Sequence, residues 1–461
     1  MSDSKHRWNS EEENVAERAV VLVPDFRNAK SQYLSTSDQV ESGNSQGLQI
    51  ERSLASRIEE ATGLARAISL NVVEAFGVSI RKQRPATLFG KGKVEEIGDL
   101  ISEAEAGLAI IDYAISPVQQ QNLETAWNCK VLDRTALILE IFGERAQTRE
   151  GRAQVELAHL NYQKGRLVRS WTHLERQRGG LGFVGGPGET QIEADRRMIS
   201  ERINRLEKQL EKIQRTRTLH RSKRQKVPYP VVALVGYTNA GKSTLFNKVT
   251  GAKVFAKDLL FATLDPTLRQ LDLPDGTKVI LSDTVGFVSN LPTHLIAAFR
   301  ATLEEVIEAD LIVHVRDISD PDTNVQSRDV YQVMEQLGVN CDDNQRILEA
   351  WNKVDLLSEE QRDSINRLRT GQGGQREPVL ISSLTGDGVD TLLGEIENRI
   401  SSRDNVLEIT LDVMSMGKLN WVYENTRVLE REDKEDGAVR LKLRANPDVI
   451  SELKGIDCDG F

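Results

Sequence analysis

The sequence has few cysteines, few aromatic residues and no long apolar run. Its three cysteines, Cys129, Cys341 and Cys458, are isolated, which argues against a zinc site or disulfide framework and favours a reducing compartment. No stretch approaches the roughly 20 apolar residues that a membrane-spanning helix needs. The first residues, Met1 to Glu13, are polar and acidic, unlike a signal or transit peptide. We therefore expect a cytoplasmic protein without a membrane span.

Charge is distributed unevenly along the 461 residues, a length that suggests about three domains. The net charge of −10 argues against nucleic-acid binding by the chain as a whole. Residues 145–226, however, hold 20 Lys and Arg against 9 Asp and Glu. This asymmetry predicts one basic arm on an acidic body.

A glycine-rich stretch fits the phosphate-loop pattern G-x-x-x-x-G-K-[ST]. It comprises Gly236, Tyr237, Thr238, Asn239, Ala240, Gly241, Lys242, Ser243 and Thr244. An apolar run at 231–235 predicts a buried strand before it, and Leu245 onward predicts a helix after it. Backbone N–H groups of such a loop cradle phosphates, Lys242 supplies a cation, and the Ser243 hydroxyl suits Mg²⁺.

Three further motifs follow in the order typical of GTPases. They are Asp283-Thr284-Val285-Gly286, Asn352-Lys353-Val354-Asp355 and Ser382-Ser383-Leu384. Asp283 suits indirect Mg²⁺ binding, and the Gly286 N–H suits contact with the γ-phosphate. The Asp355 carboxylate matches the paired donors of guanine, which adenine lacks. GTPases usually carry Ala where Ser383 stands. The motifs together predict a GTPase, which hydrolyses GTP to GDP and phosphate.

The predicted fold class is α/β, with a P-loop GTPase domain, a small α/β domain bearing a long antiparallel helical hairpin before it, and a small α+β tail after it. The expected segments are a disordered 1–15, an α/β domain at 16–144, a basic hairpin at 145–226, a GTP-binding domain at 227–403 and a tail at 404–461. Residues 28–48 predict a loop insertion. The Gly-Lys turn at 87–97 begins a helix or binds an anion; its glycine spacing excludes a second phosphate loop.

The basic arm reads as two helices joined by a glycine-rich tip. Thr190 and Glu193 predict a capping box, and an apolar seam follows at Ile192, Ile199, Ile203, Leu206, Leu210 and Ile213. Its charged faces are either solvated surface or a nucleic-acid interface. The tip favours the second reading, because glycine permits close approach to a phosphate backbone. Candidate rRNA contacts are Gly179, Gly180, Gly182, Phe183, Gly185, Gly186, Gly188, Arg196 and Arg197.

Across residues 70–400 the chain resembles the HflX family of ribosome-associated GTPases, within the Obg-HflX-like P-loop GTPases. The resemblance rests on residues 89–97, 132–135, 149–158, 185–197, 261–267, 283–287 and 298–303. It implies binding to the large ribosomal subunit, and a role in separating stalled or idle ribosomes or in subunit biogenesis. The location is then cytoplasmic, on ribosomes or at the membrane surface, and we expect a monomer.

The resemblance also implies roles at the nucleotide site. Phe261, Ala262, Thr263, Leu264 and Asp265 take the switch I position, with Thr263 as a Mg²⁺ ligand. Phe287 stands where Ras-like enzymes carry the water-orienting glutamine. Asn239 resembles the K⁺ ligand of other GTPases that lack this glutamine; alternatively, it hydrogen-bonds within the loop. The expected cofactors are Mg²⁺ and, under the first alternative, K⁺.

Two other functions stay open at this point. The protein is an assembly or RNA-binding factor that uses GTP as a timer, or its N-terminal domain remodels RNA with ATP. The lack of a second phosphate loop weighs against the last.

Overall fold

The computed structural model describes residues 17–26, 52–177, 187–224, 229–252, 260–261, 264, 266–289, 300–343, 345–371, 377–402, 405–413, 415–434, 437–445, 449–450 and 453. The chain forms two compact units. The first comprises 1–210, 257–264 and 289–299, and the second comprises 211–256, 265–288 and 300–461. Within the described residues, no helix combines the length and apolar character required to cross a bilayer.

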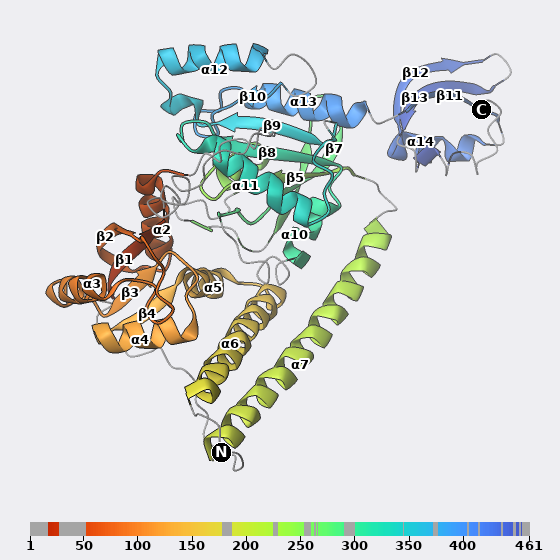
Figure 1. Cartoon of the computed structure of the whole chain (residues 1–461). Helices are drawn as coiled ribbons and strands as arrows, with labels where there is room; N and C mark the ends of the chain where they lie inside the picture. The colour runs from red at the N-terminus through yellow and green to blue at the C-terminus, as the bar shows by residue number, and fades with distance from the viewer. Residues whose placement is uncertain are drawn as a thin grey trace, which may run out of the picture. The chain divides into compact units, whose positions relative to one another are not determined.

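The first unit contains a four-stranded parallel sheet with strand order β2-β1-β3-β4 (Figure 1). Its strands are β1 (Arg18–Asp25), β2 (Asn71–Ser79), β3 (Leu108–Ile111) and β4 (Lys130–Asp133). Its helices are α2 (Leu54–Ala67), α3 (Lys91–Glu103), α4 (Pro117–Trp127) and α5 (Arg134–Arg145). This confirms a small α/β domain, although the predicted disordered end at 1–15 and the loop at 28–48 lie outside the described residues.

Short polar side chains start the helices of this domain. Ser53 accepts a hydrogen bond from the Ser56 N–H at 3.0 Å, and Asp133 accepts one from the Ala136 N–H at 2.8 Å. These contacts satisfy N–H groups that the first turn of a helix leaves without an internal partner. The Gly-Lys turn precedes α3, as one of the two readings predicts.

Two long helices form the arm, α6 (Arg149–Gln177) and α7 (Pro187–Arg224). The predicted capping box at Thr190 is wrong, because α7 already begins at Pro187, a residue whose fixed φ suits the first helical position. Ile203 and Leu206 of the predicted seam are buried, and Arg202 pairs with Glu156 of α6 at 2.7 Å. The antiparallel hairpin stays a prediction, and residues 178–186 of the tip lie outside the described residues.

The second unit contains a six-stranded sheet of order β10-β9-β8-β5-β7-β6, parallel except at β6 (Figure 1). The strands are β5 (Val231–Val235), β6 (Thr267–Asp272), β7 (Lys278–Asp283), β8 (Leu311–Asp317), β9 (Ile347–Asn352) and β10 (Val379–Leu380). The helices are α8 (Lys242–Thr250), α10 (Arg300–Ile307), α11 (Thr323–Gln336), α12 (Glu359–Gly371) and α13 (Val389–Ser401). The parallel strands direct their carboxyl ends to one edge, where such sheets bind ligands.

The C-terminal segment forms an antiparallel sheet of order β11-β13-β12 together with helix α14. Its elements are β11 (Asn405–Leu411), α14 (Leu419–Asn425), β12 (Arg427–Asp433) and β13 (Val439–Ala445). Alternate residues of β13, such as Leu441 and Leu443, enter a small core of their own. The predicted α+β tail is therefore confirmed.

Candidate functional site

The phosphate loop joins β5 to α8 as the sequence predicts. Gly241 has φ +96°, and a Cβ there would lie 2.1 Å from Asn352 Nδ2, so the position requires glycine. Lys242 is buried and donates to the Gly236 and Tyr237 carbonyls at 3.1 and 2.9 Å. Burial lowers the pKa of Lys242 to about 8, against the opposing effect of Asp283. A phosphate group at the α8 N-terminus would restore the charged form of this lysine.

Ser243 and Asp283 form a hydroxyl–carboxylate pair beside the loop. Ser243 Oγ donates to Asp283 Oδ2 at 2.7 Å, and Asp283 ends β7. Within the part of the chain that the structure describes, no three His, Cys, Asp or Glu side chains are grouped as a metal site. One hydroxyl with one carboxylate fits Mg²⁺ instead, which takes few protein ligands and keeps water and substrate phosphates as the others. Mg²⁺ held by Ser243, with Asp283 beside it, would supply positive charge against the phosphates of a bound nucleotide.

Asn352 connects the three loops around the predicted guanine site. Its Nδ2 donates to the Ala240 carbonyl at 2.8 Å, and its Oδ1 accepts from both the N–H and the hydroxyl of Ser383 at 2.9 Å. Ser382 Oγ donates to Asp355 Oδ1 at 2.5 Å and orients this carboxylate. The serine at 383, a departure from the usual alanine, thus adds a hydrogen bond to the site.

Sequence reasoning missed two features of this site. Asp317, the last residue of β8, pairs with Lys353 at 2.7 Å, although no motif includes it. Phe287 pairs its backbone with the phosphate loop: its carbonyl accepts from the Thr238 N–H at 2.7 Å, and its N–H donates to the Gly236 carbonyl at 3.1 Å. No local sequence pattern predicts either contact, because the two partners are far apart in the sequence and meet only at the ends of different strands.

The remaining predicted site residues differ in their exposure to solvent, and some of them lie outside the described residues. Asn239 is exposed with φ +61°, and Leu384 is 74% exposed. Thr284 is fully buried and donates to the Leu234 carbonyl at 2.6 Å, so its hydroxyl serves the fold. Phe261 and Leu264 are buried in the first unit. Ala262, Thr263 and Asp265 lie outside the described residues, as do Gly179, Gly180, Gly182, Phe183, Gly185 and Gly186.

The structure also describes the surroundings of the other predicted site residues. Ala240, Val285 and Gly286 are buried beside the loop, Ser243 and Thr244 are half-buried at the start of α8, and Val354 begins a short 3₁₀ turn. Gly188 lies in α7, and Arg196 and Arg197 are exposed on it.

Four protein-family profiles match the chain in order. They are described as GTP-binding GTPase N-terminal (residues 55–143), GTP-binding GTPase middle region (145–224), 50S ribosome-binding GTPase (231–353) and HflX C-terminal domain (369–455).

Individual proteins show the same relationship. The GTPase HflX of Magnetococcus marinus is 48% identical over 398 residues, covering 86% of this chain and 90% of that protein. The GTPase HflX of Escherichia coli is 40% identical over 389 residues, covering 84% and 89%. Among solved structures, a GTP-binding protein of Sulfolobus solfataricus in complex with GDP aligns with a TM-score of 0.42 and 21% identity, covering 84% of this chain and 99% of that chain. On the strength of the sequence matches, this chain belongs to the HflX family of GTPases and hydrolyses GTP.

Proposed function

We propose that this GTPase binds the large ribosomal subunit through its basic arm, and that its nucleotide state controls docking. It then acts in ribosome splitting or rescue, or in subunit biogenesis. The observation that carries the proposal is the arm itself: 20 basic against 9 acidic residues at 145–226, in a chain of net charge −10. Arg196 and Arg197 stand exposed on α7, where phosphates can reach them. The family description matched at 231–353, 50S ribosome-binding GTPase, supports the same partner.

The nucleotide site follows from the geometry around the phosphate loop. Lys242 contacts the β- and γ-phosphates, and Ser243 ligates Mg²⁺ while Asp283 acts through the metal's water shell. Asp355 accepts the N1–H and amino group of guanine. The contacts of Asn352 with Ala240 and Ser383, which hold the phosphate loop beside the guanine loops, support this assignment.

Guanine recognition is tested by Asp355→Asn. A site built on paired hydrogen bonds rejects a base lacking them by about 10⁴-fold or more where the fit is good. We therefore expect the variant to lose affinity for GTP and gain affinity for xanthosine triphosphate, measured by titration with fluorescent analogues. Asp363→Asn, an exposed carboxylate on α12, is the matched control and leaves the preference unchanged. The same nucleotide preference in both variants contradicts the role of Asp355.

Docking is tested by salt dependence and by removal of the tip. Affinity for purified large subunits is expected to fall with salt, at a log–log slope of about −0.7 to −0.9 per neutralised phosphate. Arg196→Gln and Arg197→Gln each reduce the magnitude of that slope by about one contact, whereas Arg328→Gln, exposed on α11, does not. Deleting 179–188 weakens docking and leaves GTP binding intact. Undiminished docking by the deletion variant means that the arm is only solvated surface.

A light-scattering assay with intact ribosomes then separates the two roles. GTP-dependent loss of scattering indicates splitting of the subunits. Stable binding without such a loss indicates an assembly factor with GTP as a timer.

A further inference from the structure

Buried charged side chains meet where the sheet of the N-terminal domain ends. Arg134, the first residue of α5, pairs with Asp112 and with Glu60, at 2.6 Å for the latter. Arg52 also pairs with Glu60. The four side chains are 6–9% exposed. Ion pairs at this depth are costly to desolvate and require well-placed partners.

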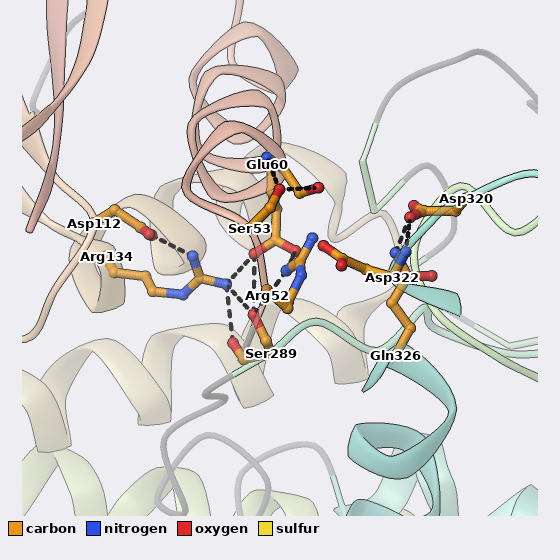
Figure 2. A network of polar contacts seen from close by, with 10 residues as sticks. Arg52, Ser53, Glu60, Asp112, Arg134, Ser289, Asp320, Asp322 and Gln326 are labelled. Carbon is orange, nitrogen blue, oxygen red and sulfur yellow. Dashed lines mark hydrogen bonds and ion pairs between the residues drawn. The ribbon is translucent and has the colours of Figure 1, made fainter. Parts of the chain in front are cut away.

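The same cluster holds Ser289, which Figure 2 shows with Arg134 and Arg52 converging on it. Arg134 Nη2 donates to the Ser289 carbonyl at 2.9 Å, and Arg52 donates to Ser289 Oγ at 3.2 Å. Ser289 Oγ in turn donates to Glu60 Oε1 at 3.2 Å. Ser289 comes three residues after Gly286, so the cluster holds the segment that directly follows the Asp283–Gly286 motif.

The position of the cluster in the sheet is informative. In the strand order β2-β1-β3-β4, the connection from β1 leads to one side of the sheet and the connection from β3 leads to the other side. Asp112 lies at this point: it directly follows β3, and its N–H donates to the Leu22 carbonyl of β1. Parallel sheets bind ligands at such a point, beyond the carboxyl ends of the strands. Here two arginines face two carboxylates, so an anionic ligand would have to displace buried ion pairs. The group seated at this position is Ser289.

A second contact joins the same domain to the predicted switch I. The rings of Phe261 and Phe142 of α5 meet edge to face at 4.8 Å, and each residue is 2% exposed. Leu260 lies against Gly63 of α2, where a Cβ would be 3.1 Å from Leu260 Cδ1. Phe261, Leu264 and Ser289 belong to the compact unit of the N-terminal domain, whereas the phosphate loop belongs to the other unit.

We infer that the N-terminal domain is a docking site for Phe261 of the predicted switch I and for Ser289, and that Arg134 is a positioning residue for the turn at Gly286, the expected contact of the γ-phosphate. This turn is held at two residues on its C-terminal side. Phe287 pairs with the backbone of the phosphate loop, and Ser289 is held two residues later. Gly286 between Asp283 and these anchors lies close to the loop, since a Cβ there would be 3.0 Å from Lys242 Nζ. Within the second unit, the Phe287 contacts hold the Gly286 N–H near this lysine. Fixing Ser289, two residues further along the chain, restricts the conformations open to this short segment, which preorganises binding of the γ-phosphate.

The inference rests on GTP binding and hydrolysis, not on ribosome docking, so its test uses the full chain without ribosomes. Arg134→Gln releases Ser289 and loosens the turn. We expect the Kd for GTPγS to rise about fivefold or more, within the range of coupling between sites, while the Kd for GDP changes less than twofold. The value of kcat for GTP falls as well, and the peptide 283–299 exchanges amide hydrogens faster.

The matched control is Arg166→Gln in the same domain. Arg166 pairs with Asp133 at 3.2 Å and contacts Gln120 and Tyr162. Among the residues that the structure describes, it forms no hydrogen bond or ion pair with Phe261 or Ser289. We expect this variant to keep the GTPγS-to-GDP affinity ratio within twofold of the original. An equal change of ratio in both variants overturns the inference, because the effect then reflects general loosening of the domain.

Arg134→Gln leaves the buried Asp112 carboxylate without its arginine, and a variant with such an unpaired charge can fail to fold. A second variant keeps the test decisive in that case. Ser289→Val removes the hydroxyl contacts with Arg52 and Glu60 and sets an apolar group against these buried charges. It keeps the backbone carbonyl and leaves the ion pairs of the domain in place. We expect the same selective loss of GTPγS affinity and the same faster exchange of 283–299. A folded variant with an unchanged GTPγS-to-GDP ratio refutes the docking site.

Discussion

At the residue scale, a single amide holds the nucleotide site together. Asn352 reaches 112 residues back to Ala240 and 31 residues forward to Ser383. The motif predicts this asparagine and its place at the end of a strand. It does not predict its partners, because a spacing pattern carries no information on which distant loops a side chain meets. For the same reason the sequence marks Ser383 only as unusual, and the structure supplies its hydrogen bond.

Asn239 is the residue through which a monovalent cation would act. Its exposed side chain makes no hydrogen bond to the described residues, so the alternative of an internal loop contact finds no support among them. We predict that GTP turnover is faster in KCl than in NaCl at equal ionic strength, because a cation beside the β- and γ-phosphates counters the charge that develops during transfer. Turnover assays in the two salts measure the difference.

The backbone at Asn239 determines which variant tests this. With φ +61°, alanine would be strained, whereas glycine adopts this region freely. Asn239→Gly therefore removes the amide oxygen and keeps the loop, and it is expected to abolish the difference between salts. Equal turnover in KCl and NaCl for the original protein leaves Asn239 as a turn residue, chosen because asparagine tolerates positive φ.

At the scale of elements, the sequence predicts strands well where both faces are buried. The apolar, β-branched run at 231–235 gives β5 its observed bounds. The sequence does not reveal β6, a sheet-edge strand in which only Leu271 is buried, since burial on one side leaves a weak pattern. It also does not reveal α5, because the stretch from Ala136 to Phe142 is apolar except for Glu140 and so lacks the broad polar face of a surface helix.

β8 carries a buried histidine that links the stability of this sheet to pH. Burial lowers the pKa of His314 to about 4; Glu349 opposes this, while Arg316 and Lys242 add to it. The unfolded chain protonates this histidine below about 6.5, but the folded chain does so only near 4. The contribution of the neutral His314 ring to the free energy of unfolding is therefore fully present above pH 6.5. It decreases as the pH falls from 6.5 toward 4, and the loss at pH 5 is about 2 kcal/mol.

Urea unfolding at pH 7 and pH 5 measures this loss. His314→Gln keeps a polar side chain that does not titrate, so its stability is expected to change less between the two pH values. The ring of His314 also meets Tyr331 edge to face at 5.2 Å, so the variant is less stable at both pH values. The informative quantity is the difference between pH values, and an identical difference in both proteins contradicts the assignment.

At the scale of the whole molecule, the sequence divides the chain into five consecutive segments, and the structure groups them otherwise. Phe261, Leu264 and Ser289, inside the expected GTP-binding domain, belong to the N-terminal unit. The contact that shows this joins Arg134 to Ser289, 155 residues apart. Reading the sequence in order assigns each residue to the same domain as its neighbours in the chain. It therefore cannot predict that a residue packs with a domain distant in sequence.

The missing glutamine has a consequence for the rate of the whole protein. Phe287 occupies its position, is 2% exposed and offers no side-chain group to orient water. We therefore predict slow hydrolysis by the free protein and acceleration by large ribosomal subunits, of about 10³ to 10⁵-fold if the partner supplies a group in trans. Single-turnover assays with and without subunits measure both rates.

The variant lacking 179–188 separates stimulation from the site itself. It keeps the phosphate loop and the guanine loops, so its rate without subunits is expected to match that of the intact chain. Its stimulation is lost, because the basic arm no longer docks. A free-protein rate already equal to the stimulated one means that this chain positions the attacking water by itself, and equal stimulation of the deletion variant places the activating contact outside the tip.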